Sequence, residues 1–79
     1  MAKKMKSILL DRLGKNLREL REAREMSQTT VAKKAKLSVS YISMLERGLR
    51  SPPLETVERL SKVFGFTDPV RLLQDFRFD

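Results

Sequence analysis

Apolar residues recur at intervals of three and four along most of the chain, which is the spacing that places side chains on one face of an α-helix. The first such stripe predicts a helix over residues 9–25 and consists of Leu10, Leu13, Leu17 and Leu20. β-branched residues are sparse, and no internal repeat interrupts the pattern. The chain is therefore predicted to be all-α.

Two short helices follow the first one, and each opens at a serine. Ser27 and Ser38 suit the N-cap position, because a serine oxygen accepts a hydrogen bond from a free backbone N–H group. Residues 36–38 form the turn between these helices, and Gly48 stops the second one. Residues 27–46 are therefore predicted to be two helices joined by a tight turn.

Proline and glycine delimit the rest of the chain. Residues 51–53, Ser-Pro-Pro, interrupt the helical pattern before a fourth helix, which ends at Gly65. Pro53 starts this helix through its fixed φ angle, without a side-chain cap. A last helix is predicted over residues 69–76, where a proline in the first turn follows a Thr-Asp cap.

Length and composition fit one small domain. A chain of 79 residues has room for a single core, and 41% hydrophobic against 34% charged residues is ordinary globular usage. We predict a compact five-helix domain over residues 9–79, after a basic flexible leader over residues 1–8. Since no apolar run has the length of a signal sequence or membrane span, we expect a soluble, cytoplasmic protein.

The residue types present exclude most catalytic chemistry. The sequence contains no cysteine and no histidine. Disulfides, thiol nucleophiles, histidine general bases and the thiolate or imidazole ligands of metal sites are therefore ruled out. We expect no enzymatic activity, no metal and no cofactor.

Basic residues are concentrated in the first part of the chain. Residues 1–50 carry 13 basic and 5 acidic side chains, whereas residues 51–79 carry 4 and 5, and the net charge is +7. This split indicates a polyanion, nucleic acid above all, at the first part and protein contact or core at the second. The alternative is a basic protein whose charge serves only solubility.

The most informative stretch is Ser27 to Gly48, with the sequence SQTTVAKKAKLSVSYISMLERG. From about Leu17 to Leu73 the chain resembles the Xre/Cro-like helix-turn-helix family of phage repressors and bacterial regulators. The matching positions are Gln28, Val31-Ala32, Ala35, Ser38, Tyr41-Ile42-Ser43, Leu45-Glu46-Arg47-Gly48, Arg50-Ser51-Pro52 and Leu54-Glu55-Thr56-Val57. The resemblance implies a lambda-repressor-like fold and binding to double-stranded DNA.

The third predicted helix, residues 39–47, has a packed side and a presented side. Tyr41, Ile42 and Leu45 fall on the packed side. The presented arc is predicted to enter the major groove and contact base edges, and it consists of Val39, Ser40, Ser43, Met44 and Arg47. Serine discriminates poorly between bases, so we expect permissive readout. The alternative is an ordinary amphipathic helix of a small bundle.

Candidate phosphate contacts surround this helix, and they are Gln28, Ser38, Tyr41, Lys36 and Arg50. Gln28 can donate its amide to a phosphate at a helix N-terminus, where the resemblance also puts such a contact. The alternatives are a solvent-exposed glutamine and, for Tyr41, packing alone. Lys36 stands where the family commonly has a glycine in a left-handed turn, so we expect backbone strain there.

Two further sets of residues concern contacts within one chain and between two chains. Arg21 and Glu46 match an internal ion pair of the family between the first helix and the end of the recognition helix, and the alternative is two exposed charges. The apolar C-terminal segment suggests a symmetric dimer contact, for which the candidates are Phe66, Leu72, Phe76 and Phe78. Completion of the monomer core is the alternative for this segment.

These observations together predict a sequence-specific, double-stranded DNA-binding transcriptional regulator that acts as a homodimer on an operator. RNA polymerase and a separate regulatory protein are candidate partners. The alternative is an antitoxin or another protein-interaction module that uses the Phe-rich segment. RNA binding is disfavoured, because single-strand recognition needs exposed aromatic side chains.

Overall fold

The computed structural model describes the backbone of residues 2–74 and the side chains of residues 8–74. Within this range four α-helices and one 3₁₀ helix follow one another: α1 (Ala2–Ala23), α2 (Gln28–Ala35), α3 (Val39–Glu46), α4 (Leu54–Val63) and η1 (Pro69–Leu73). The prediction of an all-α fold is confirmed for this part of the chain. None of the described helices has the length and apolar character that a membrane span requires.

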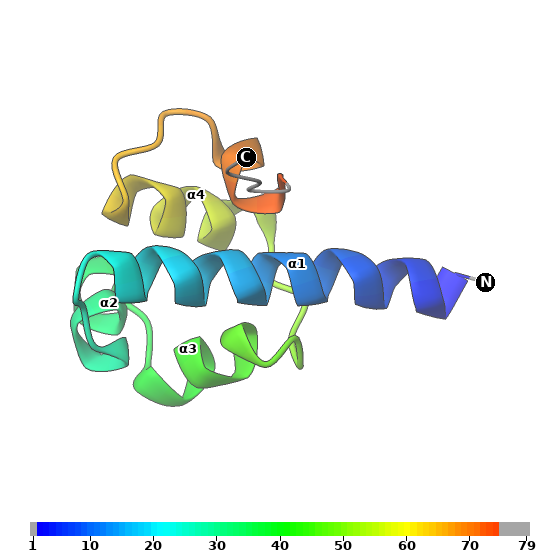
Figure 1. Cartoon of the computed structure of the whole chain (residues 1–79), viewed down its shortest axis with the longest axis horizontal. Helices are drawn as coiled ribbons and strands as arrows, with labels where there is room; N and C mark the ends of the chain where they lie inside the picture. The colour runs from blue at the N-terminus through cyan, green and yellow to red at the C-terminus, as the bar shows by residue number, and fades with distance from the viewer. Residues whose placement is uncertain (1, 75–79) are drawn as a thin grey trace.

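The longest helix, α1, runs through the middle of the molecule, with α3 on one side and α4 and η1 on the other (Figure 1). α2 packs against both α3 and α4, while α1 packs against α3 and η1. The core lies where these helices meet, and it consists of Leu13, Leu17, Val31, Ala32, Ala35, Ile42, Leu45, Val57, Leu60, Phe64 and Leu72. The fold leaves the outer side of α3 uncovered by any other described helix.

Local side chains begin and end the middle helices. The Oγ atoms of Ser27 and Ser38 accept hydrogen bonds of 3.0 Å from backbone N–H groups three residues later, so both predicted serine caps are confirmed. Pro53 is the N-cap residue of α4, and no side chain caps this helix, as predicted. Gly48 and Gly65, with φ of 72° and 79°, follow the ends of α3 and α4.

Lys36 ends α2 in the left-handed conformation that the resemblance implied. Its φ is 59° and its ψ is 45°, and its N–H group faces the carbonyl groups of Ala32 and Lys33. This conformation costs a non-glycine residue about 1–2 kcal/mol. The hydrogen bonds at the end of α2 hold the backbone of Lys36 in this conformation despite its cost.

The first helix differs from its prediction at both ends, because α1 spans Ala2–Ala23 and not residues 9–25. The backbone of residues 2–8, predicted as a leader, continues α1 without a break. This segment contains neither proline nor glycine, and Ala, Lys and Met favour the helix. The mobility of residues 1–8 in solution stays a prediction.

The prediction of a fifth α-helix is wrong for the described residues, because residues 69–73 form the 3₁₀ helix η1 and the backbone is extended at Gln74, where φ is −80° and ψ is 157°. The buried side chain of Asn16 explains this end. Its Nδ2 donates hydrogen bonds of 2.7 Å to the carbonyl oxygens of Leu72 and Gln74. In a continuing α-helix, backbone N–H groups four residues later would take these positions.

Candidate nucleic-acid interface

α3 separates a buried side from a presented side, as its helical period predicts. Ile42 and Leu45 are each 1% exposed and belong to the core. The predicted base-contact residues all keep access to solvent: Val39, Ser40 and Arg47 are exposed, and Ser43 and Met44 are half-buried. Arg47 is the C-cap of α3 and not its last helical residue, and its Nε donates to the Ser43 carbonyl at 3.4 Å. Contact of these side chains with DNA stays a prediction.

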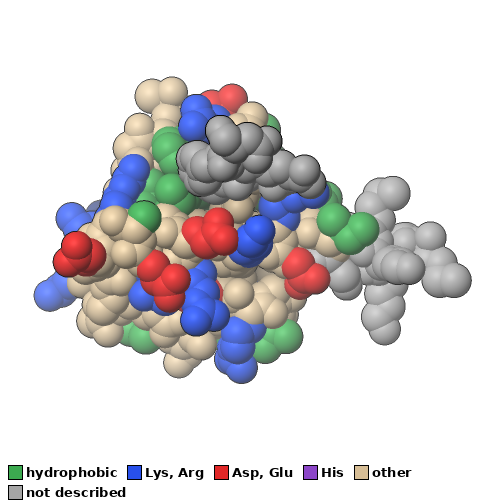
Figure 2. Space-filling view, in the orientation of Figure 1, with side chains coloured by type: hydrophobic (Ala, Val, Ile, Leu, Met, Phe, Trp, Pro, Cys, Tyr) green, Lys and Arg blue, Asp and Glu red, His purple; other side chains and the backbone are tan. Residues whose placement is uncertain are grey.

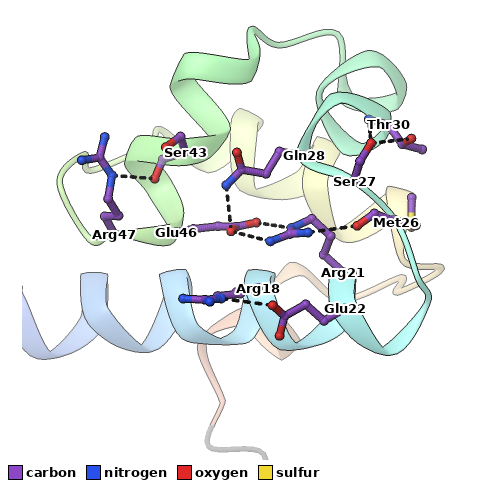
Figure 3. A network of polar contacts seen from close by, with 10 residues as sticks. All are labelled: Arg18, Arg21, Glu22, Met26, Ser27, Gln28, Thr30, Ser43, Glu46 and Arg47. Atoms are coloured by element: carbon purple, nitrogen blue, oxygen red, sulfur yellow. Dashed lines mark hydrogen bonds and ion pairs between the residues drawn. The ribbon is translucent and has the colours of Figure 1, made fainter.

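A polar network next to the presented side of α3 joins α1, α2 and α3 (Figure 3). Glu46 at the end of α3 accepts hydrogen bonds from Arg21 of α1, at 2.7 Å from Nε and 3.1 Å from Nη2. It also accepts one of 3.1 Å from Nε2 of Gln28, the first residue of α2. Arg21 donates in addition to the Met26 carbonyl at 3.0 Å. The network therefore fixes the end of α3 to α1 and to the start of α2.

The ion pair that the resemblance implied, Arg21 with Glu46, is shielded from water. The two side chains are 15% and 5% exposed. Hydrogen bonding to Glu46 raises the pKa of the Arg21 guanidinium above its ordinary value, although burial acts in the opposite direction. Because folding raises this pKa, the stabilisation that the charged guanidinium supplies is fully present at neutral pH and is lost as the pH rises through the range in which this group deprotonates.

The predicted phosphate contacts occupy different environments. Ser38, Lys36 and Arg50 are exposed, whereas Gln28 and Tyr41 are half-buried. Tyr41 packs against the core. The Gln28 amide, expected at a phosphate, donates one N–H to Glu46, and its second N–H can serve another acceptor. Ser38 accepts from Tyr41 through Oγ and keeps its hydroxyl hydrogen for donation.

Two residues of α1 that sequence reasoning missed hold other elements in place. Gly14 is buried, and a Cβ atom there would lie 2.5 Å from the Leu45 carbonyl oxygen and 2.7 Å from that of Glu46, so α1 and α3 approach closely. The available signal was a glycine inside a strong helical pattern. Asn16 binds the backbone at the end of η1. The sequence signal for this role was a polar side chain on the apolar stripe of α1.

The outward face of α1 does not hold the basic surplus of the chain. Basic and acidic side chains are mixed over this face (Figure 2). Lys15 pairs with Glu19 at 3.9 Å and Arg18 with Glu22 at 3.2 Å, in each case one helical turn apart. Such exposed pairs contribute little to stability, and they leave this face nearly neutral.

The structure also bears on the predicted dimer contact. Leu72 is 0% exposed, so the prediction that it lies in a dimer interface is wrong, because η1 inserts this side chain into the core beside α1 and α4. Phe66 is half-buried and packs against the core, with the Arg71 guanidinium carbon 5.1 Å from its ring centroid. Phe76 and Phe78 lie outside the described residues.

Two short, capped helices joined by a tight turn, with the second helix anchored at its end and presented on one side, define a DNA-binding helix-turn-helix domain. A helix-turn-helix family model matches residues 17–72. The chain belongs to this family of transcription regulators, and the identification as Xre/Cro-like is confirmed by its relatives.

The HTH-type transcriptional regulator DdrOP3 of Deinococcus deserti is 43% identical over 56 residues, which are 71% of this chain and 43% of that protein. The control protein C.BamHI of Bacillus amyloliquefaciens is 38% identical over 53 residues, 66% of this chain and 65% of its own. The crystal structure of the restriction-modification controller protein C.AhdI from Aeromonas hydrophila is similar at a TM-score of 0.75 and 36% identity, covering 80% of this chain and 94% of that one.

The matched region spans less than half of several relatives. It covers 43% of DdrOP3 and 37% of the immunity repressor protein of Bacillus phage phi105, which is 34% identical over 53 residues and 67% of this chain. The common part is the helix-turn-helix domain. What those longer proteins do outside this part does not transfer to the chain.

Proposed function

We propose that the chain is a sequence-specific, double-stranded DNA-binding transcriptional regulator that acts as a homodimer on an operator. The observation that carries the proposal is the uncovered side of α3, anchored at its end by the Arg21–Glu46 pair. The major groove of B-DNA admits an α-helix, and a helix held at a fixed angle can present the same side chains to the same base pairs.

Direct readout would come from the small side chains of α3. Ser40 and Ser43 can donate to or accept from several base edges, and Val39 and Met44 can contact a thymine methyl group. Arg47 can reach a base or a phosphate. Because none of these groups except Arg47 can make a bidentate base contact, part of the specificity would come from the deformability of the operator.

Phosphate contacts would supply most of the affinity. The exposed groups available for them are the hydroxyl of Ser38, the ammonium group of Lys36 and the guanidinium of Arg50. The backbone N–H groups of Gln28 and Thr29, at the start of α2, lack intrahelical partners and are available as well. If a dimer engages about six to ten phosphates, the logarithm of the binding constant should fall with the logarithm of salt concentration with a slope on the order of −5 to −9.

A dimer contact would use the C-terminal part of the chain. Leu54 at the start of α4 and Val70 in η1 are 77% and 53% exposed, and α4 and η1 pack against each other. This exposed apolar surface replaces Leu72 in our proposal. In a two-fold dimer the recognition helices would lie about 34 Å apart, so selected sites should be inverted repeats. Sedimentation of Leu54→Lys against the parent chain tests the contact.

The deciding experiment selects bound duplexes from a random pool and then measures variants on the selected and on a scrambled duplex. Ser40 is exposed, so Ser40→Ala should leave stability within about 0.5 kcal/mol but lower the ratio of affinities for the selected and the scrambled duplex about three- to tenfold. Arg50→Ala should weaken both duplexes alike. Lys15→Ala, on the charge-balanced face of α1, is the control and should change the affinity for neither duplex.

An unchanged ratio for Ser40→Ala, together with an unchanged ratio for Met44→Ala, would reject α3 as the reading element. The alternative of a protein-interaction module built on the Phe-rich segment is not favoured, because Leu72 is buried and Phe66 packs against the core.

A further inference from the structure

A basic depression lies between the end of α2 and α4, and no residue of α3 lines it. Its volume is about 430 Å³, and it is lined by Lys34, Ala35, Lys36, Arg59, Lys62 and Val63. Small-molecule sites commonly measure about 300–1,000 Å³. We call this depression the α2–α4 pocket.

The positive charge of the side chains that line the α2–α4 pocket exceeds the negative charge of the neighbouring carboxylate and helix C-termini. Its lining contains four cationic side chains and no acidic one. Arg59 pairs with Glu55 at 3.6 Å, which offsets one of these charges. α2 and α4 both end at the pocket, and two helix C-termini supply about one further negative charge between them. A surplus of about +2 therefore remains, so the lysines do more than balance the helix dipoles.

The pocket has fixed as well as flexible parts. Ala35 is buried, Val63 is half-buried, and the backbone of Lys36 is held in its left-handed conformation by the hydrogen bonds that close α2. Ammonium groups on flexible stems and one guanidinium group suit phosphate oxygens, which accept charge-assisted hydrogen bonds from both. The lining therefore fits a compact, multiply charged anion.

No residue of α3 lines the pocket, although Lys36 lies two residues before Ser38, one of the proposed phosphate contacts. α4 lies on the opposite side of α1 from α3 (Figure 1). Gln28 and Lys36, at the two ends of α2, are eight residues apart, or about 12 Å at the rise of an α-helix. Lys36, predicted as a DNA contact, lines this pocket with residues of α4.

We propose that the α2–α4 pocket is a second anion site, which binds a multiply charged phosphate group. The group belongs either to a free polyphosphate compound or to a nucleic-acid backbone that passes this side of the domain. The site does not depend on the operator reading proposed above, because none of its side chains lies on the presented side of α3.

Inorganic tripolyphosphate is the probe, titrated into the isotope-labelled chain without DNA and followed by the amide NMR signals. Saturable shifts are expected at residues 34–36 and 59–63. Lys34→Gln should weaken binding about three- to fivefold, and the double variant with Lys62→Gln about tenfold or more. Lys33→Gln is the matched control, because Lys33 is also exposed on α2 but does not line the pocket, and it should change binding less than twofold.

Equal effects of Lys33→Gln and Lys34→Gln, or shifts centred on residues 38–50, would overturn the proposal in favour of general attraction to a basic protein. The source of the phosphate is decided with the selected duplex at its minimal length and with flanking DNA. If the double variant weakens only the longer duplex, a nucleic-acid backbone occupies the site. If it weakens neither duplex but abolishes tripolyphosphate binding, the site takes a free compound.

Discussion

Gly14→Ala tests how closely α1 packs against α3. The added Cβ atom would lie 2.5 Å from the carbonyl oxygen of Leu45 and 2.7 Å from that of Glu46, whereas ordinary van der Waals contact begins at 3.4 Å. Both neighbours are backbone atoms and cannot turn away as a flexible side chain would. The end of α3 must therefore move by about 0.9 Å relative to α1 at this point.

Two opposing terms decide the sign of the effect. In a helix interior without such contacts, replacing glycine with alanine stabilises by about 1 kcal/mol. Overpacking a core contact costs about 1–3 kcal/mol, and the required movement also disturbs the hydrogen bonds between Arg21 and Glu46. We expect a net loss of about 1–2 kcal/mol, which lowers the midpoint of thermal unfolding by several degrees in a domain of this size.

Thermal and urea unfolding followed by circular dichroism measure the loss, and amide NMR shifts should place the structural change in residues 39–48. Lys15→Ala, at the exposed neighbouring position of the same helix, is the control and should stay within about 0.5 kcal/mol. If Gly14→Ala is more stable than the parent chain, helix propensity alone governs this position and the inferred close approach of the two helices is refuted.

Three further changes probe contacts elsewhere. Asn16→Asp places a carboxylate against two backbone carbonyls and should cost more than about 2 kcal/mol at neutral pH; urea unfolding should show recovery at low pH, where the protonated carboxyl can donate. Glu46→Gln should cost about 2–4 kcal/mol by leaving Arg21 shielded and unpaired, and in a double-mutant cycle Arg21→Met should recover part of this loss. Gly65→Ala should cost about 1 kcal/mol through its φ of 79° alone, since nothing lies within 4 Å of the added Cβ, and Gly65→Asn should cost less in thermal unfolding.

The middle of the fold could be predicted because its boundaries depend on local side chains. Ser27 and Ser38 cap helices through hydrogen bonds to N–H groups three residues later, and Gly48 and Gly65 supply the positive φ that follows α3 and α4. Such signals lie within one helical turn of the boundary that they set. The two sides of α3 followed in the same way from its period.

The ends of the fold depend on contacts that the local pattern does not contain. The partner of η1 is Asn16, which is 56 residues from Leu72 along the chain. At the other end the apolar stripe begins near Leu10, although nothing in residues 2–9 stops the helix from continuing towards the N-terminus. The Gln28–Glu46 hydrogen bond and the α2–α4 pocket likewise depend on how the helices pack, for which spacing along the sequence gives no signal.

The position of α3 is set almost entirely by what holds it. A helix of eight residues is unstable in isolation, so its orientation comes from α1 and α2, on which it packs. Gly14 sets the distance of its end from α1, and Glu46 sets the direction through Arg21 and Gln28. If α3 reads base edges, a shift of its end misplaces every reading side chain at once. Gly14→Ala and Glu46→Gln should therefore weaken binding to a selected duplex more than to a scrambled one, although neither residue is among the proposed DNA contacts. Equal weakening of both duplexes would instead mean that these contacts serve stability alone.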